Sequence, residues 1–293
     1  MRILVLGSNG QLGSCLQDQL DAEYYDVFFA SRSDIDVTDN DSLISNFLKI
    51  KPNIVINSSA YTDVDGAESN KESAYQTNHI AVKNIATQCK THNSHLIHIS
   101  TDYVFDGTIN RPYKEEDTTS PNSIYGSSKL MGEDEIKKSG CKFIIIRTSW
   151  VFSEYGSNFL KTMMHLASKK NSLNIVSDQV GCPTYAQDIA IAISKILKDI
   201  ILSPNISGIY NFCGDRPCSW FEFANSIFLQ ADVRKFKVPE TVNSILTKQF
   251  PTPANRPKYS VLDCAKIKKD FGIKPSNWEL GISAALKNIK NNT

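Results

Sequence analysis

No apolar run in this sequence approaches the roughly 20 residues that a membrane-spanning helix needs. There is no excess of one charge either, because 32 Lys and Arg nearly balance 31 Asp and Glu. The net charge of +1 gives no electrostatic reason to expect a nucleic acid or a membrane as a partner. Repeats and low-complexity segments are also missing, which leaves a globular fold of one large domain or two small ones sharing a core.

The seven cysteines form no Cys-x-x-Cys pair, and no cluster of Cys and His has the spacing of a zinc site. We therefore expect no metal site, and the odd number of scattered cysteines favours a reduced, cytoplasmic protein. None of the five histidines pairs with an Asp beside a Ser as in a hydrolase triad. His98 lies inside an apolar run, and we expect it to be structural.

Short apolar runs alternate with helical patterns through the first half of the chain. Because strand-then-helix alternation favours a parallel sheet covered on both faces, we predict an α/β fold with a Rossmann-type doubly wound parallel sheet. The predicted strands cover residues 3–6, 27–30, 54–56, 96–99 and 143–146, and the predicted helices cover 11–20, 42–48, 68–89 and 127–138.

The pattern is less regular after Trp150. Residues 158–167 and 187–197 are expected to be helical, and 175–184 to form a loop or an edge strand. The last ninety residues hold seven of the eleven prolines and are expected to form a smaller, irregular lobe. We therefore predict a Rossmann NAD(P)-binding domain and a smaller α/β substrate-binding lobe. The first comprises residues 1–150 with about 177–207, and the second 151–176 with 208–293.

A glycine-rich turn follows the first predicted strand and opens the first predicted helix, with the spacing Gly-x-x-Gly-x-x-Gly at 7–13. Gly7 allows a tight turn, Gly10 lets the backbone approach a pyrophosphate, and Gly13 permits close packing of helix on strand. The helix start then offers free N–H groups and a positive dipole end to phosphates. These glycines and Asn9 are candidate cofactor-binding residues.

The end of the second predicted strand bears on the choice of cofactor. An acidic residue there would bind the 2′-hydroxyl of NAD, and the tip of this strand has none. Arg32 suits a 2′-phosphate instead, so we expect NADP(H) to be preferred, with NAD(H) also possible. In the alternative, Arg32 is only a solvated loop residue. Asp36 and Val37 are expected to flank the adenine.

Of the eleven tyrosines, only Tyr125 is followed four residues later by a lysine, Lys129. On a helix these side chains face the same way, so the ammonium can lower the pKa of the phenol and hold the nicotinamide ribose. Tyr125 can then give a proton to a carbonyl oxygen as hydride reaches its carbon. Thr101, at the end of the fourth predicted strand, can donate to the developing oxyanion.

Taken together, the motifs of this chain resemble those of the dTDP-4-dehydrorhamnose reductases, a branch of the extended short-chain dehydrogenase superfamily. The matching pieces run in order along almost the whole chain. Besides the glycine turn they are Asn57-Ser-Ser-Ala-Tyr-Thr-Asp-Val-Asp65, Ser100-Thr-Asp-Tyr-Val-Phe-Asp-Gly107, Tyr125-Gly-Ser-Ser-Lys129, Arg147-Thr-Ser-Trp-Val-Phe152, Asn158-Phe-Leu-Lys161, Asp178-Gln-Val-Gly-Cys-Pro-Thr184 and Arg256-Pro-Lys-Tyr-Ser-Val-Leu-Asp263.

The resemblance implies reduction of the C4 ketone of a nucleotide-linked 4-keto-6-deoxyhexose by NADPH or NADH. In that case Thr101, Tyr125 and Lys129 are catalytic. The resemblance further places Gln11 and Leu12 at the cofactor phosphates, Ala60 and Tyr61 along the cofactor, and Val64, Asp102, Tyr103, Trp150 and Asn158 at the sugar. Arg256 either meets the nucleotide diphosphate or anchors the lobe.

Two departures and two alternatives accompany the resemblance. The first departure is Ser58-Ser59, which stands at the cofactor edge where the family usually has small apolar residues. Some members dimerise through a magnesium site built from glutamates, and the matching positions here are Cys15 and Gln187, which are poor ligands for a hard cation. We therefore expect no magnesium and a monomer or weak dimer. The alternatives are a reductase of a different nucleotide 4-keto sugar and a non-catalytic regulatory subunit. A dehydratase or epimerase is disfavoured, because Asp102-Tyr103 stands where those enzymes need Asp-Glu.

Overall fold

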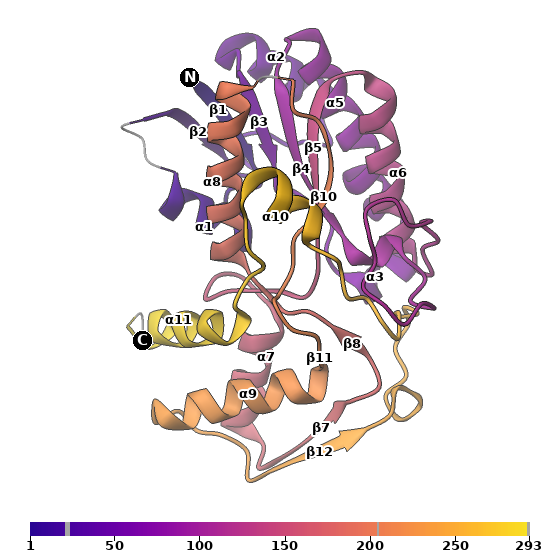
Figure 1. The fold of residues 1–293 in the computed structure, drawn as a ribbon, viewed down its shortest axis with the longest axis vertical. Coiled ribbons are helices and arrows are strands. Elements are labelled where there is room, and N and C mark those ends of the chain that lie inside the picture. The colour runs from indigo at the N-terminus through magenta and orange to yellow at the C-terminus, as the bar shows by residue number, and fades with distance from the viewer. Residues whose placement is uncertain (21–23, 204, 292–293) are drawn as a thin grey trace.

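The computed structural model describes residues 1–20, 24–203 and 205–291. It has two parts, a layered α/β unit that carries the N-terminus and a smaller lobe that contains the C-terminal helix (Figure 1). The sheet of the larger unit has six parallel strands in the order β10-β5-β4-β3-β1-β2. Their bounds are β1 (Arg2–Leu6), β2 (Asp26–Ala30), β3 (Ile54–Asn57), β4 (His95–Thr101), β5 (Lys142–Thr148) and β10 (Gly208–Asn211).

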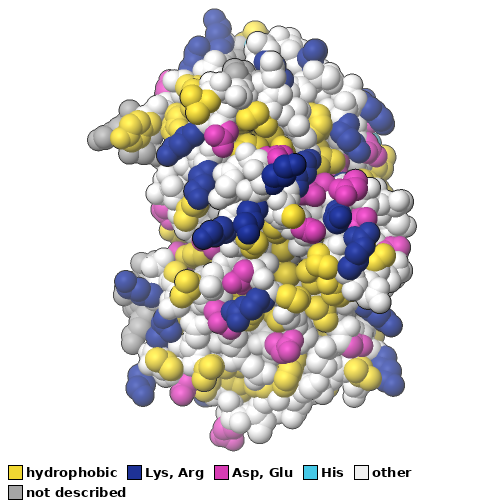
Figure 2. Space-filling view, viewed as in Figure 1, with side chains coloured by type: hydrophobic (Ala, Val, Ile, Leu, Met, Phe, Trp, Pro, Cys, Tyr) yellow, Lys and Arg dark blue, Asp and Glu magenta, His cyan; other side chains and the backbone are white. Residues whose placement is uncertain are grey.

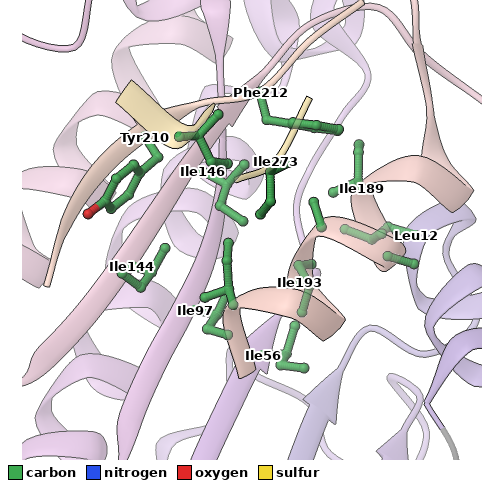
Figure 3. Packing of buried hydrophobic residues seen from close by; sticks show 14 of the residues in the cluster. Leu12, Ile56, Ile97, Ile144, Ile146, Ile189, Ile193, Tyr210, Phe212 and Ile273 are labelled. Carbon is green, nitrogen blue, oxygen red and sulfur yellow. The ribbon is translucent and has the colours of Figure 1, made fainter. Parts of the chain in front are cut away.

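Helices cover both faces of this sheet because its central strands are apolar on both sides. One face packs against α1 (Gln11–Gln19) and α8 (Ala186–Leu202), and the close-up in Figure 3 shows Leu12 and Ile193 meeting the isoleucines of the sheet. The other face packs against α2 (Asn40–Ile50), α5 (Ala81–Thr91) and α6 (Ile124–Ser139). The doubly wound Rossmann-type arrangement predicted from the sequence is confirmed.

The start of α6 is fixed by local chemistry. The hydroxyl of Ser123 accepts a hydrogen bond from the backbone N–H of Gly126, and such a cap stabilises a helix by about 1 kcal/mol. A Cβ on Gly126 would collide with the carbonyl oxygen of Tyr103, so only glycine lets the helix start approach the end of β4 this closely. The cap and the glycine together place Tyr125 in the first turn.

The prediction of one helix over 68–89 is only partly correct. The structure has a separate short helix, α3 (Val64–Ser69), followed by a continuous run of α4 (Lys71–Tyr75), the π-helical η1 (Gln76–Ile80) and α5. Asn70 separates the two because its side chain donates to the carbonyl oxygen of Gly66 and so closes α3. This competition between side chain and backbone is typical of Asn.

The lobe has its own apolar core, which contains Phe152, Phe223 and Trp278. Its helices are α7 (Phe159–Lys169), α9 (Trp220–Val233) and α11 (Trp278–Asn291), and its strand pairs are β7 (Ser172–Val176) with β12 (Thr241–Ile245), β8 (Val180–Gly181) with β11 (Cys218–Ser219), and β6 (Val151–Phe152) with β9 (Thr184–Tyr185). The expectation of an irregular lobe is only partly correct, because residues 250–264 contain no helix or strand whereas most of the lobe is built from these elements. Its prolines stand between the elements, and Ser219 forms a capping box with Glu222 at the start of α9.

The expected start of the lobe at residue 208 is also wrong. Gly208–Asn211 forms β10, which pairs in parallel with β5 as the edge strand of the main sheet. Helix α10 (Ala265–Phe271), which lies later in the chain, packs against β10 and α8. Four residues with a single buried aromatic, Tyr210, carry too weak a pattern to be recognised as a strand.

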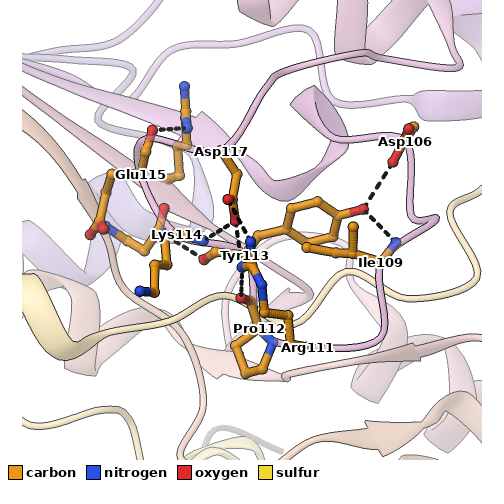
Figure 4. Close-up of polar contacts among 10 residues, drawn as sticks. Asp106, Ile109, Arg111, Pro112, Tyr113, Lys114, Glu115 and Asp117 are labelled. Carbon is orange, nitrogen blue, oxygen red and sulfur yellow. Dashed lines mark hydrogen bonds and ion pairs between the residues drawn. The ribbon is translucent and has the colours of Figure 1, made fainter.

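The segment after β4 begins with the 3-10 helix η2 (Asp102–Val104), and Figure 4 shows polar contacts that hold residues 106–117 of this segment together. The hydroxyl of Tyr113 donates to Asp106 at 2.9 Å, and Arg111 donates twice to Asp117 at 2.8 Å. The backbone N–H of Tyr113 donates to the carbonyl oxygen of Val261. The end of β4 is thereby held against the C-terminal part of the chain.

Figure 2 shows basic and acidic side chains interspersed over one face of the molecule, in keeping with the net charge of +1. Among the helices within residues 1–20, 24–203 and 205–291, none has both the length and the apolar character of a membrane span.

Candidate active site

A cavity of about 740 Å³ lies where the carboxyl ends of the sheet strands face the lobe. Every candidate residue named from the sequence lines it except Gly13. Those lining residues are Gly7, Asn9, Gly10, Gln11, Leu12, Arg32, Asp36, Val37, Ala60, Tyr61, Val64, Thr101, Asp102, Tyr103, Tyr125, Lys129, Trp150, Asn158 and Arg256.

The glycine turn forms one wall of this cavity. Gly7 has φ +81, and a Cβ there would lie 2.7 Å from the backbone nitrogen of Ser59, so the turn tolerates no side chain. Gly13 packs directly on the backbone of Gly7 and Ser8, which explains why it lies behind the cavity. Within the described residues no side chain caps α1 at Gly10. Its first amides and its positive dipole end therefore fit the phosphates of a dinucleotide.

Arg32 stands at the rim next to this turn. Its side chain is 84% exposed and its Nε lies 3.5 Å from a carboxylate oxygen of Asp36. The hydroxyl and backbone N–H of Thr38 both donate to that carboxylate, and these bonds hold the pKa of Asp36 below its ordinary value. An exposed guanidinium in a loose ion pair is free to turn towards a bound phosphate.

The three expected catalytic residues line the cavity together, with Thr101 and Lys129 buried and Tyr125 half-buried. Thr101 ends β4, and Tyr125 and Lys129 lie one turn apart on α6. Burial raises the pKa of the Tyr125 phenol well above its ordinary value, against a smaller opposing effect of the Thr101 hydroxyl. This differs from the expectation that Lys129 lowers the pKa of Tyr125. A phenol that keeps its proton is suited to donate it to a developing alkoxide.

Lys129 is 2% exposed, and its Nζ donates to the carbonyl oxygen of Ile99 at 2.6 Å. Burial lowers the pKa of Lys129 to about 8, while the nearby carboxylate of Glu133 acts in the opposite direction. His98 also meets Nζ, at 3.4 Å from its Nε2. The sequence singled out Lys129 by spacing alone and gave no sign that His98 contacts it.

Asp102 is a second buried group with an unmatched charge. Its Oδ1 accepts from the Thr101 hydroxyl at 3.0 Å, whereas its Oδ2 accepts no hydrogen bond within the described part of the chain. Burial raises the pKa of Asp102 to about 6. Tyr103 stands edge-on to Tyr125, with ring centroids 5.6 Å apart. A carboxylate oxygen without a partner at this place is suited to accept a hydrogen bond from a hydroxyl of a ligand.

Two stacked indoles form the lobe side of the cavity. Trp150 and Trp220 lie nearly parallel with ring centroids 3.4 Å apart, and Trp150 adopts the left-handed φ of +47. Gly181 packs against the Trp150 ring so closely that a Cβ would collide with it. The sequence pointed to Trp150 but not to Trp220. Nothing in the local sequence pairs two residues 70 positions apart.

Arg256 and Asn158 are largely committed to the protein itself. The guanidinium of Arg256 donates to Asp65 of α3 at 2.7 Å and to the Tyr103 hydroxyl of η2 at 3.0 Å, so it anchors its own segment to the Rossmann-type unit. It also lines the cavity. The Asn158 amide donates to Gln11 at 2.8 Å and its oxygen caps α7, so Asn158 shapes the wall rather than offering free polar atoms.

The sequence reasoning missed a further set of lining residues, most of which follow strand ends or lie in the lobe. Their positions after predicted strands were a usable signal, since ligands gather beyond the carboxyl ends of parallel strands. They are Ile35, Thr38, Thr62, Thr77, Ile99, Ser100, Thr148, Ser149, Val151, Gly156, Ser157, Ile189 and Trp220.

Comparison with known proteins agrees with this geometry. The family model of the RmlD substrate binding domain matches residues 1–291. A dTDP-4-dehydrorhamnose reductase of Aggregatibacter actinomycetemcomitans is 44% identical over 99% of this chain and 98% of its own length. This chain belongs to the dTDP-4-dehydrorhamnose reductase family. The resemblance inferred from the motifs is therefore confirmed.

Two solved structures of the same family share the fold closely. The dTDP-4-dehydrorhamnose reductase of Bacillus anthracis in complex with NADP has a TM-score of 0.90 at 36% identity, covering 100% of this chain and 99% of its own. A Clostridium acetobutylicum dTDP-4-dehydrorhamnose reductase has a TM-score of 0.92 at 36% identity, covering 99% of this chain and 100% of its own. The whole chain thus has the family fold, lobe included.

The positions that carry magnesium ligands in some members look different here. Cys15 is fully buried, and Gln187 donates to Gln19 at 3.1 Å. The described residues contain no group of three or more His, Cys, Asp or Glu side chains arranged to hold a metal ion. The absence of a magnesium requirement stays a prediction.

Proposed function

We propose that this protein is an NAD(P)H-dependent reductase that converts dTDP-4-dehydro-β-L-rhamnose to dTDP-L-rhamnose. The observation that carries the proposal is one cavity lined both by a dinucleotide-type glycine turn and by the Thr101, Tyr125 and Lys129 group. Relatives that bear the name dTDP-4-dehydrorhamnose reductase match the chain over nearly its full length. A nucleotide-linked 4-keto-6-deoxyhexose is therefore the substrate class that both observations favour.

The reaction needs a hydride at C4 and a proton at the ketone oxygen. A nicotinamide cofactor bound by Gly7, Gly10 and the start of α1 would supply the hydride. Tyr125 donates the proton from a phenol that burial keeps protonated. The Thr101 hydroxyl turns from Asp102 to the same oxygen, donates a hydrogen bond to it and so stabilises the charge that develops on it. Lys129 lies one helical turn from Tyr125, and its ammonium group orients the reacting groups.

NADP(H) is the cofactor that we propose to be preferred, with NAD(H) also accepted. The exposed Arg32 side chain at the rim supports this preference because a guanidinium binds a 2′-phosphate well. The Bacillus anthracis relative was solved in complex with NADP. Val37 and Asp36 line the same end of the cavity and are assigned to the adenine side.

The sugar is assigned to the lobe side of the cavity. The Trp150 and Trp220 pair offers a flat apolar wall that suits the hydrophobic face of a deoxysugar. Val64, Asp102 and Tyr103 face the same space, and Arg256 adds positive charge for the diphosphate. We assign the cytoplasm as the location and a monomer or weak dimer as the state in solution.

The testing experiment is NADPH oxidation with dTDP-4-dehydrorhamnose prepared enzymatically from dTDP-glucose, followed by identification of the product. We expect turnover to dTDP-L-rhamnose, and a repeat with NADH would rank the cofactors. Absence of turnover with NADPH still bound tightly would overturn the substrate assignment. It would then favour another nucleotide 4-keto sugar or a regulatory subunit.

A further inference from the structure

A chain of buried hydrogen bonds leads from the end of β3 to Lys129. The backbone N–H of Ser59 donates to Asn57 Oδ1 at 3.1 Å, and the Ser59 hydroxyl donates to the same atom at 2.6 Å. A backbone N–H can only donate, so the oxygen of the Asn57 amide must face Ser59. The other end of that amide, Nδ2, then lies 3.1 Å from His98 Nδ1 and donates to it.

The next link is the His98 imidazole. Its side chain is fully buried, and burial, with a smaller effect of Lys129, lowers the pKa of His98 well below its ordinary value. A neutral imidazole carries one N–H and one lone pair. Since Nδ1 accepts from Asn57, the proton must sit on Nε2, which lies 3.4 Å from Lys129 Nζ.

The Nε2–H of His98 points at Nζ and interacts differently with the ammonium form and the amine form of Lys129. The ammonium form has three donors and no acceptor, so it gains nothing from a second donor, whereas the amine form has a lone pair that can accept. We propose that Ser59 and Asn57 hold the proton of His98 on Nε2, and that this N–H makes His98 a positioning residue for Lys129 that favours its amine form. The tautomer follows from geometry alone, while its kinetic meaning rests on the proposed function.

The other charged groups around Lys129 do not cancel this effect. Glu133 on the same helix favours the ammonium, but its carboxylate is already bound by Arg147 and by Ser100. Among the other charged side chains on elements packed against α6, Glu68 of α3 accepts from the Ile124 backbone and His79 of η1 lies 3.8 Å from Glu135. Asp102 of η2 accepts from Thr101 through one oxygen and has no partner for the other within the described residues.

A lysine that releases its proton near neutral pH can resupply the proton donor. After Tyr125 gives its proton to the ketone oxygen, an N–H bond of Lys129 breaks and the O–H bond of Tyr125 forms again. The resulting amine accepts the N–H of His98 and later takes a proton from solvent. His98 thereby stabilises the state of Lys129 that follows each transfer.

The first test needs no turnover. Nitrogen-15 NMR of the full-length protein, with and without NADP+, reports which nitrogen of each histidine is protonated, and the His98→Gln variant assigns the His98 signals. We expect His98 to be protonated at Nε2 and unprotonated at Nδ1. A proton on Nδ1, or a doubly protonated ring at neutral pH, would overturn the proposal. This result stands whether or not any 4-keto sugar is reduced.

The second test uses the Asn57→Asp variant to reverse the direction of the hydrogen bonds that join residue 57, His98 and Lys129. A carboxylate can only accept, so it takes the proton of His98 on Nδ1 and leaves Nε2 to accept from the Lys129 ammonium. We expect the alkaline limb of the kcat/KM profile to move up by about one pH unit or more, with NADPH affinity nearly unchanged. The NMR signals of His98 in this variant must show the proton on Nδ1. If the alkaline limb shifts while the proton stays on Nε2, the shift is an effect of the added charge only, and the proposal is overturned. An unshifted limb overturns it as well.

Asn53→Asp is the matched control. Asn53 accepts from the backbone N–H of Arg2 at the opposite end of β3, and an aspartate can accept the same bond. It adds the same charge roughly 13 Å from residue 57 along the strand, beyond the Debye length at physiological salt. We expect its pH profile and its His98 signals to match those of the wild type. If Asn57→Asp does not fold, the wild-type NMR result alone decides.

Discussion

Two charged side chains are buried one turn apart on α6, and the protein treats them in opposite ways. Glu133 is fully matched, since its carboxylate accepts from Arg147 at 2.7 and 3.0 Å and from the Ser100 hydroxyl at 2.5 Å. Arg147 in turn donates to the carbonyl oxygen of Glu115 and lies over the Phe105 ring. This cluster joins β4, β5 and α6, and few of its polar atoms remain available to bind a ligand.

The group around Lys129 is left incomplete. Lys129 donates to a backbone carbonyl and has no carboxylate within ion-pair distance among the described residues, and Asp102 keeps one carboxylate oxygen without a partner. Burial moves the pKa of Lys129 down and that of Asp102 up, so both titrate closer to neutral pH. Buried charges that the protein does not satisfy itself are costly for stability and useful for chemistry. The comparison therefore separates a stabilising cluster from a functional one within a single helix.

The largest expected effect comes from changing Tyr125, the proton donor that we propose. Tyr125→Phe removes only a hydroxyl, so we expect kcat to fall by a factor on the order of 10² or more while NADPH affinity stays the same. Steady-state kinetics and cofactor titration measure the two quantities. Tyr24→Phe, at a side chain that is mostly exposed, is the control. A near-normal kcat for Tyr125→Phe would contradict the assigned role.

Breaking the stabilising cluster should cost folding instead. Glu133→Gln leaves Arg147 buried without its counter-charge, and we expect the free energy of unfolding to fall by about 3 to 5 kcal/mol. Denaturant unfolding measures the loss. Glu135→Gln on the same helix removes a partner of the exposed Lys138 and should cost less than about 1 kcal/mol. Equal losses for the two variants would mean that Glu133 has no special structural role.

Asp102→Asn should sharpen the comparison through pH. The pKa of Asp102 is raised to about 6 in the folded chain, so its contribution to stability is present below the unfolded value near 3.9 and is lost as pH rises through 6. The variant lacks this loss. Between low pH and pH 8, the stability of the variant relative to the wild type should therefore rise by on the order of 2 to 3 kcal/mol.

Unfolding free energies of both proteins at pH 4 and pH 8 test this expectation about Asp102. The variant should also reduce turnover, because the neutral amide replaces an acceptor beside Thr101. If the stability difference between the variant and the wild type is the same at the two pH values, burial does not raise the pKa of Asp102.

Trp220 extends the comparison to the lobe. Trp220→Leu removes half of the indole stack, and we expect the KM for the sugar nucleotide to rise roughly fivefold, equivalent to about 1 kcal/mol, with the KM for NADPH unchanged. Phe250→Leu, at an exposed side chain outside the cavity, is the control. A rise in both KM values would instead indicate a general disturbance of the lobe.

The smallest expected effect is none at all. The described residues contain no group of three or more His, Cys, Asp or Glu side chains that could hold a metal ion, and Cys15 and Gln187 are poor magnesium ligands. EDTA should therefore change neither activity nor mass in solution, measured by turnover and by light scattering. Activity that is lost with EDTA and restored by magnesium would contradict this expectation.

Most of the fold and of the candidate site could be predicted from local patterns in the sequence. Apolar strands, the glycine turn and the Tyr125–Lys129 spacing are each set by neighbours along the chain, and Thr101 follows from its place at a strand end. The missed features depend on contacts between distant segments. β10 is defined by pairing with β5, Trp220 by stacking on Trp150, and the role inferred for His98 by contacts with Asn57 and Lys129.

The most direct test of the central claim uses NADPH that carries deuterium at the transferring position of the nicotinamide, in a single turnover with dTDP-4-dehydrorhamnose. The account predicts dTDP-L-rhamnose with deuterium at C4 of the sugar, formed by the wild type and at least about 10² more slowly by Tyr125→Phe. Tight NADPH binding without any transfer of deuterium to the sugar would contradict it.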